Sequence, residues 1–230
     1  MRDSNACFEE GPEPTLRVMR QSGLVPYETA YALQLRLRGE VRQGVSPSTL
    51  ILLEHAPVIT LGRNADTAHL LLTEAEYASR GIDLVHVNRG GDATYHGPGQ
   101  LVAYPILDLS LWRKSIRWYL RTLEETLIHQ LAGYGLQGER IEGLTGVWVN
   151  GAKVAAIGVG IHRWVTFHGI ALNVSVSLDD FATIVPCGIQ DREVTSLDRL
   201  LPAPPTLAQA MDDFERSFRA VFGCREPGRV

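Results

Sequence analysis

The dipeptide Asn150-Gly151 is the strongest constraint on how this chain can fold. It lies between two apolar segments, residues 147–149 and 152–161. Asn and Gly tolerate the positive φ angles of a tight two-residue turn, and such a turn forces the flanking segments into adjacent antiparallel strands. Residues 166–176 are a further apolar segment that we expect to pair with the second strand. The chain is therefore expected to fold around a β-sheet.

Helix signals surround this group of strands. Apolar residues at three- and four-residue steps predict a helix over residues 115–133, with a buried face made of Ile116, Leu120, Leu123, Leu127, Leu131 and Tyr134. The same reasoning predicts helices over residues 26–43, 74–80 and 206–223, and short strands over residues 16–21, 50–53, 58–61, 84–87 and 101–107. This mixture predicts an α+β fold with a central mixed β-sheet flanked by helices.

Composition excludes several classes of protein. The 230 residues are 45% hydrophobic and 21% charged, with a formal net charge of −4, which gives no reason to expect nucleic-acid or membrane binding. No apolar run approaches the roughly 18 residues of a membrane span. The three cysteines, Cys7, Cys187 and Cys224, do not suggest a disulfide framework, so we expect a reducing compartment, the cytoplasm. Residues 1–14 are predicted to be a disordered leader and residues 15–230 a single domain.

Residues 89–100 form the most glycine-rich stretch of the chain, with four glycines and a proline in twelve residues. We expect a loop or a system of tight turns here, not a regular element. Exposed backbone N–H groups in such a loop can bind an anion or a carbonyl oxygen, and the missing Cβ atoms allow a ligand to approach closely. The spacing fits neither a phosphate-binding P-loop nor a dinucleotide fingerprint. A ligand loop and a purely structural turn both remain open.

A single cysteine lies late in the chain, within Pro186-Cys187-Gly188. Proline fixes its own φ and glycine permits unusual backbone geometry, so the Cys187 thiol is predicted to sit on a rigid turn. Such a thiol is a candidate nucleophile if a neighbouring group activates it. The alternative is a buried cysteine that acts as a small hydrophobic residue.

Lys153 and the histidines are the candidate partners of that thiol. A lysine ammonium stabilises a thiolate, although a lysine at the edge of a hairpin more often extends into water. His96 and His168 lie in glycine-rich settings and are candidate bases, whereas we expect His55, His69 and His129 to be surface or turn residues. The sequence contains no Cys-x-x-Cys pair and no His-Glu-x-x-His motif, so no metal site is predicted.

Taken together, these stretches resemble a known family, the lipoyl(octanoyl) transferases, which are octanoyl-acyl carrier protein:protein N-octanoyltransferases. The glycine-rich loop Arg89-Gly90-Gly91-Asp92-Ala93-Thr94-Tyr95-His96-Gly97-Pro98-Gly99-Gln100 is similar to the ligand loop of that family. The other matching stretches, in order, are residues 23–27, 53–63, 151–158, 168–173 and 186–188. The departures are Asp92-Ala93 within the loop and Ala56, where a second proline is common.

The resemblance implies a fold similar to the catalytic fold of the biotin/lipoate protein ligases, and acyl transfer that needs no ATP and no cofactor. It implies that Cys187 takes the octanoyl group from octanoyl-acyl carrier protein as a thioester and that Lys153 lowers the pKa of the thiol and relays protons. The acceptor would be a lysine of a lipoyl domain in a 2-oxoacid dehydrogenase complex or of the glycine-cleavage H protein. The implied substrate-binding residues are Arg89, Gly90, Gly91, Asp92, Ala93, Thr94, Tyr95, His96, Ala156, Ile157, Gly158, Gly169, Ile170 and Ala171.

Three other functions compete with this one. An ATP-dependent lipoate or biotin ligase would share the fold but would not need a cysteine nucleophile. A non-catalytic module that binds lipoyl domains would tolerate the loss of Cys187, and a cysteine hydrolase would release free octanoate. A further hypothesis concerns Arg113, Arg117 and Arg121, which are spaced four apart and could form a basic helix face that docks an acidic acyl carrier protein; a merely solvated face is the alternative.

Overall fold

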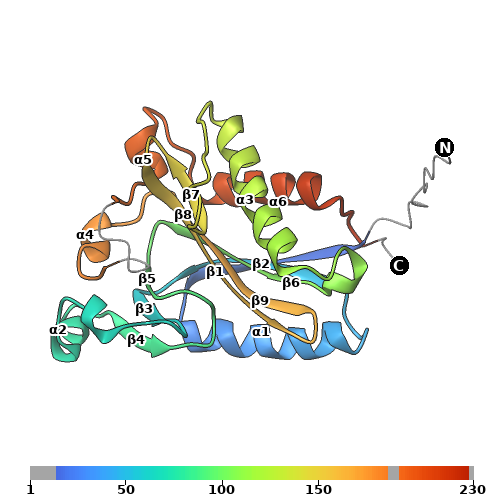
Figure 1. The fold of residues 1–230 in the computed structure, drawn as a ribbon, viewed down its shortest axis with the longest axis horizontal. Helices are drawn as coiled ribbons and strands as arrows, with labels where there is room; N and C mark the ends of the chain where they lie inside the picture. Colours follow the sequence, from blue (N-terminus) through green and yellow to red (C-terminus); the bar gives the residue numbers. More distant parts are fainter. Residues whose placement is uncertain (1–13, 186–191, 228–230) are drawn as a thin grey trace, which may run out of the picture.

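The computed structural model describes residues 14–185 and 192–227, and its centre is a six-stranded mixed sheet (Figure 1). The strands are β1 (Leu16–Val25), β2 (Ser48–His55), β6 (Gln100–Ile106), β7 (Gly146–Val149), β8 (Ala152–His162) and β9 (Val165–Asn173). Their order is β1-β2-β6-β9-β8-β7, in which β1 and β2 are parallel and all other neighbours are antiparallel. Asn150 (φ 51°) and Gly151 (φ 80°) form the turn between β7 and β8, which confirms the predicted hairpin.

Helices cover both faces of this sheet, as the sequence predicted. Helix α1 (Tyr27–Arg42) packs on one face, and α3 (Ile116–Gly133) and α6 (Leu207–Phe222) pack on the other (Figure 1). Thr206 accepts a hydrogen bond from Gln209 N and begins α6 with a capping box, and Gly223 ends it in the left-handed conformation. The remaining short helices outside the second sheet are η2 (Leu109–Leu111) and α5 (Leu197–Leu200).

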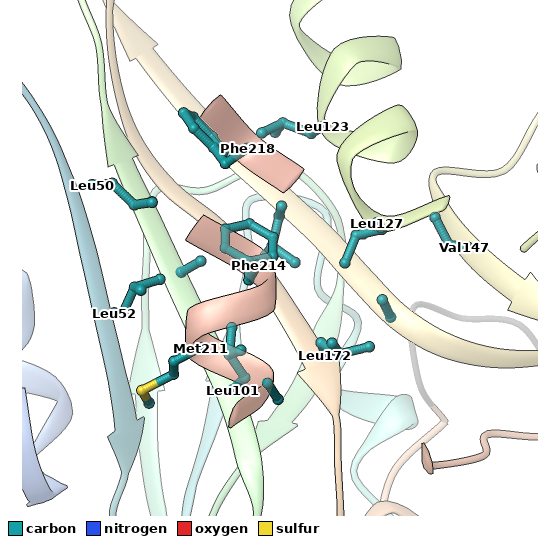
Figure 2. Packing of buried hydrophobic residues seen from close by; sticks show 14 of the residues in the cluster. Leu50, Leu52, Leu101, Leu123, Leu127, Val147, Leu172, Met211, Phe214 and Phe218 are labelled. Atoms are coloured by element: carbon teal, nitrogen blue, oxygen red, sulfur yellow. The ribbon is translucent and has the colours of Figure 1, made fainter. Parts of the chain in front are cut away.

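The larger hydrophobic core lies between the sheet and the pair α3 and α6. Phe214 and Phe218 of α6 contact Leu123 and Leu127 of α3 and the sheet side chains Leu50, Leu52, Leu101 and Leu172, all fully buried or nearly so (Figure 2). The predicted apolar face of α3 is correct from Leu123 onward, but Ile116 is 53% exposed. Ile116 is the first residue of the helix, where Ser115 caps the chain, so it lies beyond the edge of the core.

A second, three-stranded sheet has the order β4-β3-β5, with β4 (Asp83–His86), β3 (Val58–Leu61) and β5 (Ala93–His96). Helix α2 (Glu74–Ser79), η1 (Thr67–His69) and α4 (Leu178–Phe181) lie beside it. Its own core contains Ile59, Tyr77, Tyr95 and Phe181. The sequence did not separate this sheet from the central one.

Strand β5 corrects the prediction that residues 89–100 contain no regular element. Ala93–His96 pairs antiparallel with β3. Ala93 and Tyr95 enter the core of the small sheet, while Thr94 and His96 face the opposite side. This alternation is the ordinary period of a strand, but glycines on both sides concealed it. In the part of the chain that the structure describes, no helix is long and apolar enough to cross a membrane.

Candidate active site

A pocket lies where the two sheets meet, on the α1 side of the six-stranded sheet. It is lined by Tyr27, Arg89, Gly90, Gly91, Thr94, His96, Tyr104, Ala156, Ile157, Gly158, His168, Gly169, Ile170 and Ala171. These residues come from the start of α1, the glycine-rich loop with β5, and strands β6, β8 and β9. The structure therefore brings together every substrate-binding residue that the sequence suggested, except Asp92, Ala93 and Tyr95.

Small residues on β8 and β9 create the room for this pocket. Ala156 pairs with Ala171, and Gly158 pairs with Gly169 on the neighbouring strand. A Cβ on Gly158 would lie 3.0 Å from Cδ of Arg89, so its absence lets the glycine-rich loop approach β8. The result is a slot whose apolar wall suits an alkyl chain.

The side chains of Asp92, Ala93 and Tyr95 do not line the pocket. They support the glycine-rich loop from the side of the small sheet. The Tyr95 hydroxyl donates to Asp180 Oδ2 at 2.8 Å, and its ring packs on Phe181. Asp92 accepts a hydrogen bond from the backbone of Ala93, and its Oδ2 lies 2.5 Å from His69 Nδ1. These three residues act in this structure as framework for the pocket, and none of them lines it.

Arg89 is a buried positive charge in the pocket wall. Its side chain is held by β3, because Nη2 donates to Thr60 O at 2.6 Å and Nε donates to Thr60 Oγ1 at 3.2 Å. Only 7% of the residue is exposed. A charge fixed in this way affects nearby titratable groups more strongly than a charge in water, because the surrounding dielectric is low.

Three histidines gather beside the pocket: His55, His96 and His168. Burial lowers the pKa of His55 to about 4, and burial together with neighbouring His55 lowers the pKa of His96 to about 3. Burial, with Arg89 and Arg38 nearby, lowers the pKa of His168 to about 3. All three imidazoles are therefore neutral at pH 7, so they give this side of the pocket polar groups without charge.

His55 was predicted to be a surface or turn residue, and this prediction is wrong. It is fully buried, with Nδ1 2.8 Å from Val25 O and Nε2 2.8 Å from the Tyr104 hydroxyl. The local sequence Glu-His-Ala-Pro is typical of a turn, and it does end β2. The tertiary fold then closes over the turn with Tyr27, whose ring centroid lies 5.3 Å from that of His55. Tyr27 and Tyr104 were also not predicted as site residues. Tyr27 lies in one of the stretches that resemble the family, whereas Tyr104 had no signal that distinguished it from a core residue.

His168 has a backbone conformation that is unusual for a residue with a side chain. Its φ is 56°, within strand β9. This left-handed geometry costs about 1–2 kcal/mol outside glycine and is often found at functional sites. Gln34 accepts a hydrogen bond from His168 N at 2.7 Å, and Nδ1 lies 3.3 Å from the Tyr27 hydroxyl. These contacts hold the imidazole in the pocket wall.

Lys153 lies beside the pocket and not at a solvated hairpin edge. Only 6% of it is exposed, and Nζ lies 5.2 Å from the ring centroid of Trp148. Lys153 lines a small hollow that shares Thr94 and Ala156 with the larger pocket. The functional interpretation of Lys153 is therefore compatible with its position.

A β-bulge directs Lys153 toward this hollow. Val147 pairs with Ala155 but the next residue of β7, Trp148, pairs with Lys153, so Val154 is the extra residue. Val154 and Ala155 both enter the main core. In a regular strand Lys153 and Ala156 would face opposite sides, because they are three residues apart. The bulge places both on the side of the hollow, as bulges near active sites commonly do.

Cys187, the candidate nucleophile, lies outside the described residues, so the structure does not place it. The described chain on both sides of residues 186–191 is anchored near the site. Val185 N donates to His69 O at 2.9 Å, and Lys153 N donates to Glu193 O at 2.8 Å. Within residues 14–185 and 192–227, no group of three or more His, Cys, Asp or Glu side chains could hold a metal ion.

Solved structures with the same fold are lipoate and biotin ligases. A lipoate-protein ligase A bound with ATP has a TM-score of 0.73 at 18% identity, with 95% of this chain and 90% of that chain covered. A bipartite lipoate protein ligase from Thermoplasma acidophilum, studied with its E2 lipoyl domain, has a TM-score of 0.71 at 17% identity, covering 95% and 88%. The biotin protein ligase of Aquifex aeolicus, in complex with biotin and ATP, has a TM-score of 0.56 at 13% identity, covering 90% and 70%. The predicted α+β fold is thereby confirmed.

Sequence similarity is much closer to another group. Proteins named octanoyltransferase from Gloeobacter violaceus and Chloroflexus aggregans are each 50% identical to this chain, over 212 and 206 residues. The matches cover 91% and 88% of this chain and 92% and 93% of the relatives. The family model of the lipoyl protein ligase A/B catalytic domain matches residues 26–219. This chain belongs to that family.

Proposed function

We propose that this protein transfers an octanoyl group from octanoyl-acyl carrier protein to a lysine of lipoyl-domain proteins, as a step of lipoate biosynthesis. The observation that carries this proposal is the 50% identity, over about nine tenths of both chains, to proteins named octanoyltransferase. The narrow pocket walled by Ala156, Gly158, Gly169 and Ala171 supports it, because a saturated eight-carbon chain needs an apolar slot.

The proposed reaction has two acyl-transfer steps through Cys187. The Cys187 thiolate attacks the thioester carbonyl, and the tetrahedral intermediate collapses with loss of the carrier's thiolate. The ε-amine of the acceptor lysine then attacks the new thioester, loses a proton and expels the Cys187 thiolate. A thiolate is both a good nucleophile and a good leaving group, so it suits a two-step transfer. Conversion of a thioester to an amide is downhill and requires no nucleotide.

Lys153 is the proposed partner of Cys187. Its burial beside the acyl pocket supports this role, because a cation close to a thiol favours the thiolate. The chain beyond residues 186–191 also returns to Lys153, since Val194 lines the same hollow and Thr195 N donates to Lys153 O at 2.9 Å. In this scheme the neutral amine of Lys153 takes the proton of the Cys187 thiol, and the resulting ammonium stabilises the thiolate and then protonates the thiolate of the departing carrier. In the second step the amine of Lys153 takes the proton that the acceptor lysine loses and passes it to the departing Cys187 thiolate.

We propose that the acceptors are lipoyl domains of 2-oxoacid dehydrogenase complexes and the glycine-cleavage H protein. The structure of a bipartite ligase with its E2 lipoyl domain is of a protein with the same fold, which supports an acceptor of this kind. We further propose that residues 15–230 act as one catalytic domain in the cytoplasm. The substrate-binding role of the pocket residues belongs to the same proposal.

The second candidate is an ATP-dependent ligase that activates free lipoate or octanoate. It is favoured by the structural neighbours, two of which contain ATP. A ligase would transfer the acyl group only when nucleotide and free acid are supplied. Turnover with octanoyl-acyl carrier protein in the absence of ATP therefore separates the two functions.

The test is intact-mass measurement after incubation with octanoyl-acyl carrier protein, before and after addition of lipoyl domain. Wild type and the control Cys224→Ala should gain one octanoyl group and pass it to the lipoyl domain, whereas Cys187→Ser should gain none. Lys153→Ala should form the adduct more slowly. Octanoyl transfer that persists in Cys187→Ser would contradict the assignment of Cys187 as the nucleophile. Release of free octanoate in the presence of lipoyl domain would indicate a hydrolase, and a Cys187→Ser protein with full biological activity would indicate a binding module.

A further inference from the structure

A line of buried amide side chains connects the acyl pocket to the segment that holds Lys153. Gln100 of β6 and Asn173 of β9 are paired residues on adjacent strands of the six-stranded sheet. Gln100 Nε2 donates to Asn173 Oδ1 at 3.0 Å, and Asn173 Nδ2 donates to Thr195 O at 2.9 Å. At the other end, His96 Nδ1 lies 2.7 Å from Gln100 Oε1. Gln100 and Asn173 are 1% and 4% exposed, so water does not replace these bonds.

The direction of every hydrogen bond in this line follows from its last member. Thr195 O is a backbone carbonyl and can only accept, so Asn173 must present its NH₂ group to it and its oxygen to Gln100. Gln100 then presents its NH₂ group to Asn173 and to Tyr95 O, which leaves Oε1 to accept from His96. His96 therefore carries its proton on Nδ1. Its Nε2 is then the unprotonated ring nitrogen, and His96 lines the pocket.

The same line ends on the backbone of Lys153. Residues 193–195 run beside the start of β8, where Lys153 N donates to Glu193 O and Thr195 N donates to Lys153 O. Asn173 is the side chain that bonds this segment to the sheet, and it lines the same hollow as Lys153. A substitution of Asn173 would release Thr195 O and so shift residues 193–195. Because these residues pair with the backbone of Lys153, Lys153 would shift with them.

We propose that Asn173 and Gln100 are positioning residues that fix Lys153 relative to the acyl pocket. They join β5, β6 and β9 to residues 193–195, so that the wall that holds the acyl chain and the strand that carries the ammonium form one rigid unit. This inference rests on the proposed role of Lys153 in acyl transfer. It adds two residues that act through Lys153.

The decisive variant is Asn173→Asp, which keeps the size of the side chain but replaces the NH₂ donor by oxygen. An ionised carboxylate would face Thr195 O without a proton between them, and the segment of residues 193–195 would shift. We expect acyl-enzyme formation, followed by intact mass under single-turnover conditions, to slow about tenfold to a hundredfold, as small misplacements of reacting groups commonly cause. The KM for octanoyl-acyl carrier protein should change little, because the pocket wall remains.

The pH dependence distinguishes positioning from simple damage. In the Asn173→Asp variant, a protonated carboxyl group can donate to Thr195 O and accept from Gln100, which restores the original pattern. The ratio of the wild-type rate to the Asn173→Asp rate should therefore shrink as pH falls. A constant ratio across the pH range would overturn the proposal, because a merely loosened fold would not recover on protonation.

The matched control is Gln130→Glu, at a buried amide in a different place. Gln130 Nε2 also donates to a backbone carbonyl, Ala210 O at 2.9 Å, but it lies between α3 and α6 with no connection to Lys153. Its rate should equal the wild-type rate at a temperature where both proteins are folded. Equal slowing in the two variants would overturn the proposal. If Asn173→Asp does not fold, Gln100→Glu removes the donor to Asn173 and should show the same pattern more weakly.

Lys153→Ala separates this inference from the proposed function. If Lys153→Ala slows acyl-enzyme formation while Asn173→Asp and Gln100→Glu behave like Gln130→Glu, only the positioning inference fails. If Lys153→Ala forms the acyl-enzyme at the wild-type rate, the role of Lys153 itself fails, and the inference fails with it. Slowing in Lys153→Ala and in Asn173→Asp, with recovery of the latter at low pH, supports both.

Discussion

The two faces of the six-stranded sheet differ in the kind of side chain that they bury. The face beneath α3 and α6 is apolar and close-packed, with Phe214, Phe218 and leucines in contact (Figure 2). The face toward α1 and the small sheet buries His55, His168 and Asn173, each with a hydrogen-bond partner. Apolar burial stabilises a fold by about 25 cal/mol per Å², whereas a buried polar group contributes little net stability and costs about 1–3 kcal/mol if its partner is lost.

This difference indicates a division of tasks between the two faces. The apolar face supplies the stability that holds the strands in register. The polar face depends on that stability, because its groups keep their geometry only while the backbone around them is rigid. Substitutions on the two faces should therefore affect different measurements.

The largest effect is expected for Phe214→Ala on the apolar face. Phe214 is fully buried between α6, α3 and the sheet, so its removal should lower the free energy of unfolding by about 3–5 kcal/mol. Urea denaturation measures this loss, and the acyl-enzyme rate per folded molecule should stay at the wild-type value. Leu111→Ala, at a residue that is 57% exposed, is the control and should change stability by less than about 0.5 kcal/mol. Comparable losses in the two variants would remove the distinction between core and surface on which the comparison rests.

An intermediate effect is expected from the three histidines of the polar face. The unfolded chain binds protons near pH 6.5, but the folded protein keeps His55 neutral to about pH 4 and His96 and His168 to about pH 3. Their contribution to stability is therefore complete above pH 6.5 and is lost as pH falls toward those values. Between pH 7.5 and 5.5, each histidine should lower the free energy of unfolding by about 1.4 kcal/mol.

His55→Gln tests this pH dependence directly. The free energy of unfolding of this variant should fall less than that of wild type between pH 7.5 and 5.5. The difference should be about 1.4 kcal/mol, the contribution of one histidine, when both proteins are measured by urea denaturation. The exposed His162→Gln removes a histidine from the surface and serves as the control. A wild-type protein with equal stability at the two pH values would show that the polar face is not held neutral.

The smallest effect is expected on the outer surface of α3, where docking of an acidic carrier was the hypothesis. The three arginines do not form one helix face, because Arg113 precedes α3. Arg121 Nη1 lies 2.7 Å from Glu124 Oε2, so its charge is paired within the helix. Arg117 is exposed on the helix and is therefore the position to test. Arg117→Glu should lower kcat/KM for octanoyl-acyl carrier protein about twofold to fivefold at low salt and flatten its salt dependence. The control Arg80→Glu makes the same charge change directly after α2. Identical values and slopes in both variants would leave α3 with a stabilising role alone.

Much of the fold could be predicted because its signals are local. The spacing of Leu123, Leu127 and Leu131 defines one helix face, and Asn150-Gly151 defines one turn, without reference to any distant residue. The composition of residues 89–100 left a ligand loop and a structural turn open, and the resemblance to a known family then marked this loop and the strand pair β8 and β9 as ligand-binding segments. The structure brings most of those residues around one pocket.

Features that depend on pairing between distant segments could not be predicted. Strand β5 becomes regular only because β3 pairs with it, and His55 becomes buried only because Tyr27 closes over it. The direction of Lys153 depends on an extra residue, Val154, whose presence is defined by the pairing of β7 with β8. No pattern within any one of these segments reports the register of its partner.

The long helices, the central hairpin and the class of fold can be read from the chain without its structure. Those properties depend on side-chain periodicity and on the φ preferences of single residues, which act over a few positions. Most residues of the site could also be named from the chain, but only through its resemblance to a known family. Packing in three dimensions determines which side of a strand faces the pocket, which histidines are neutral and how Gln100 and Asn173 connect His96 to Lys153. Those properties depend on strand register and burial, which exist only when segments far apart in the chain are packed together.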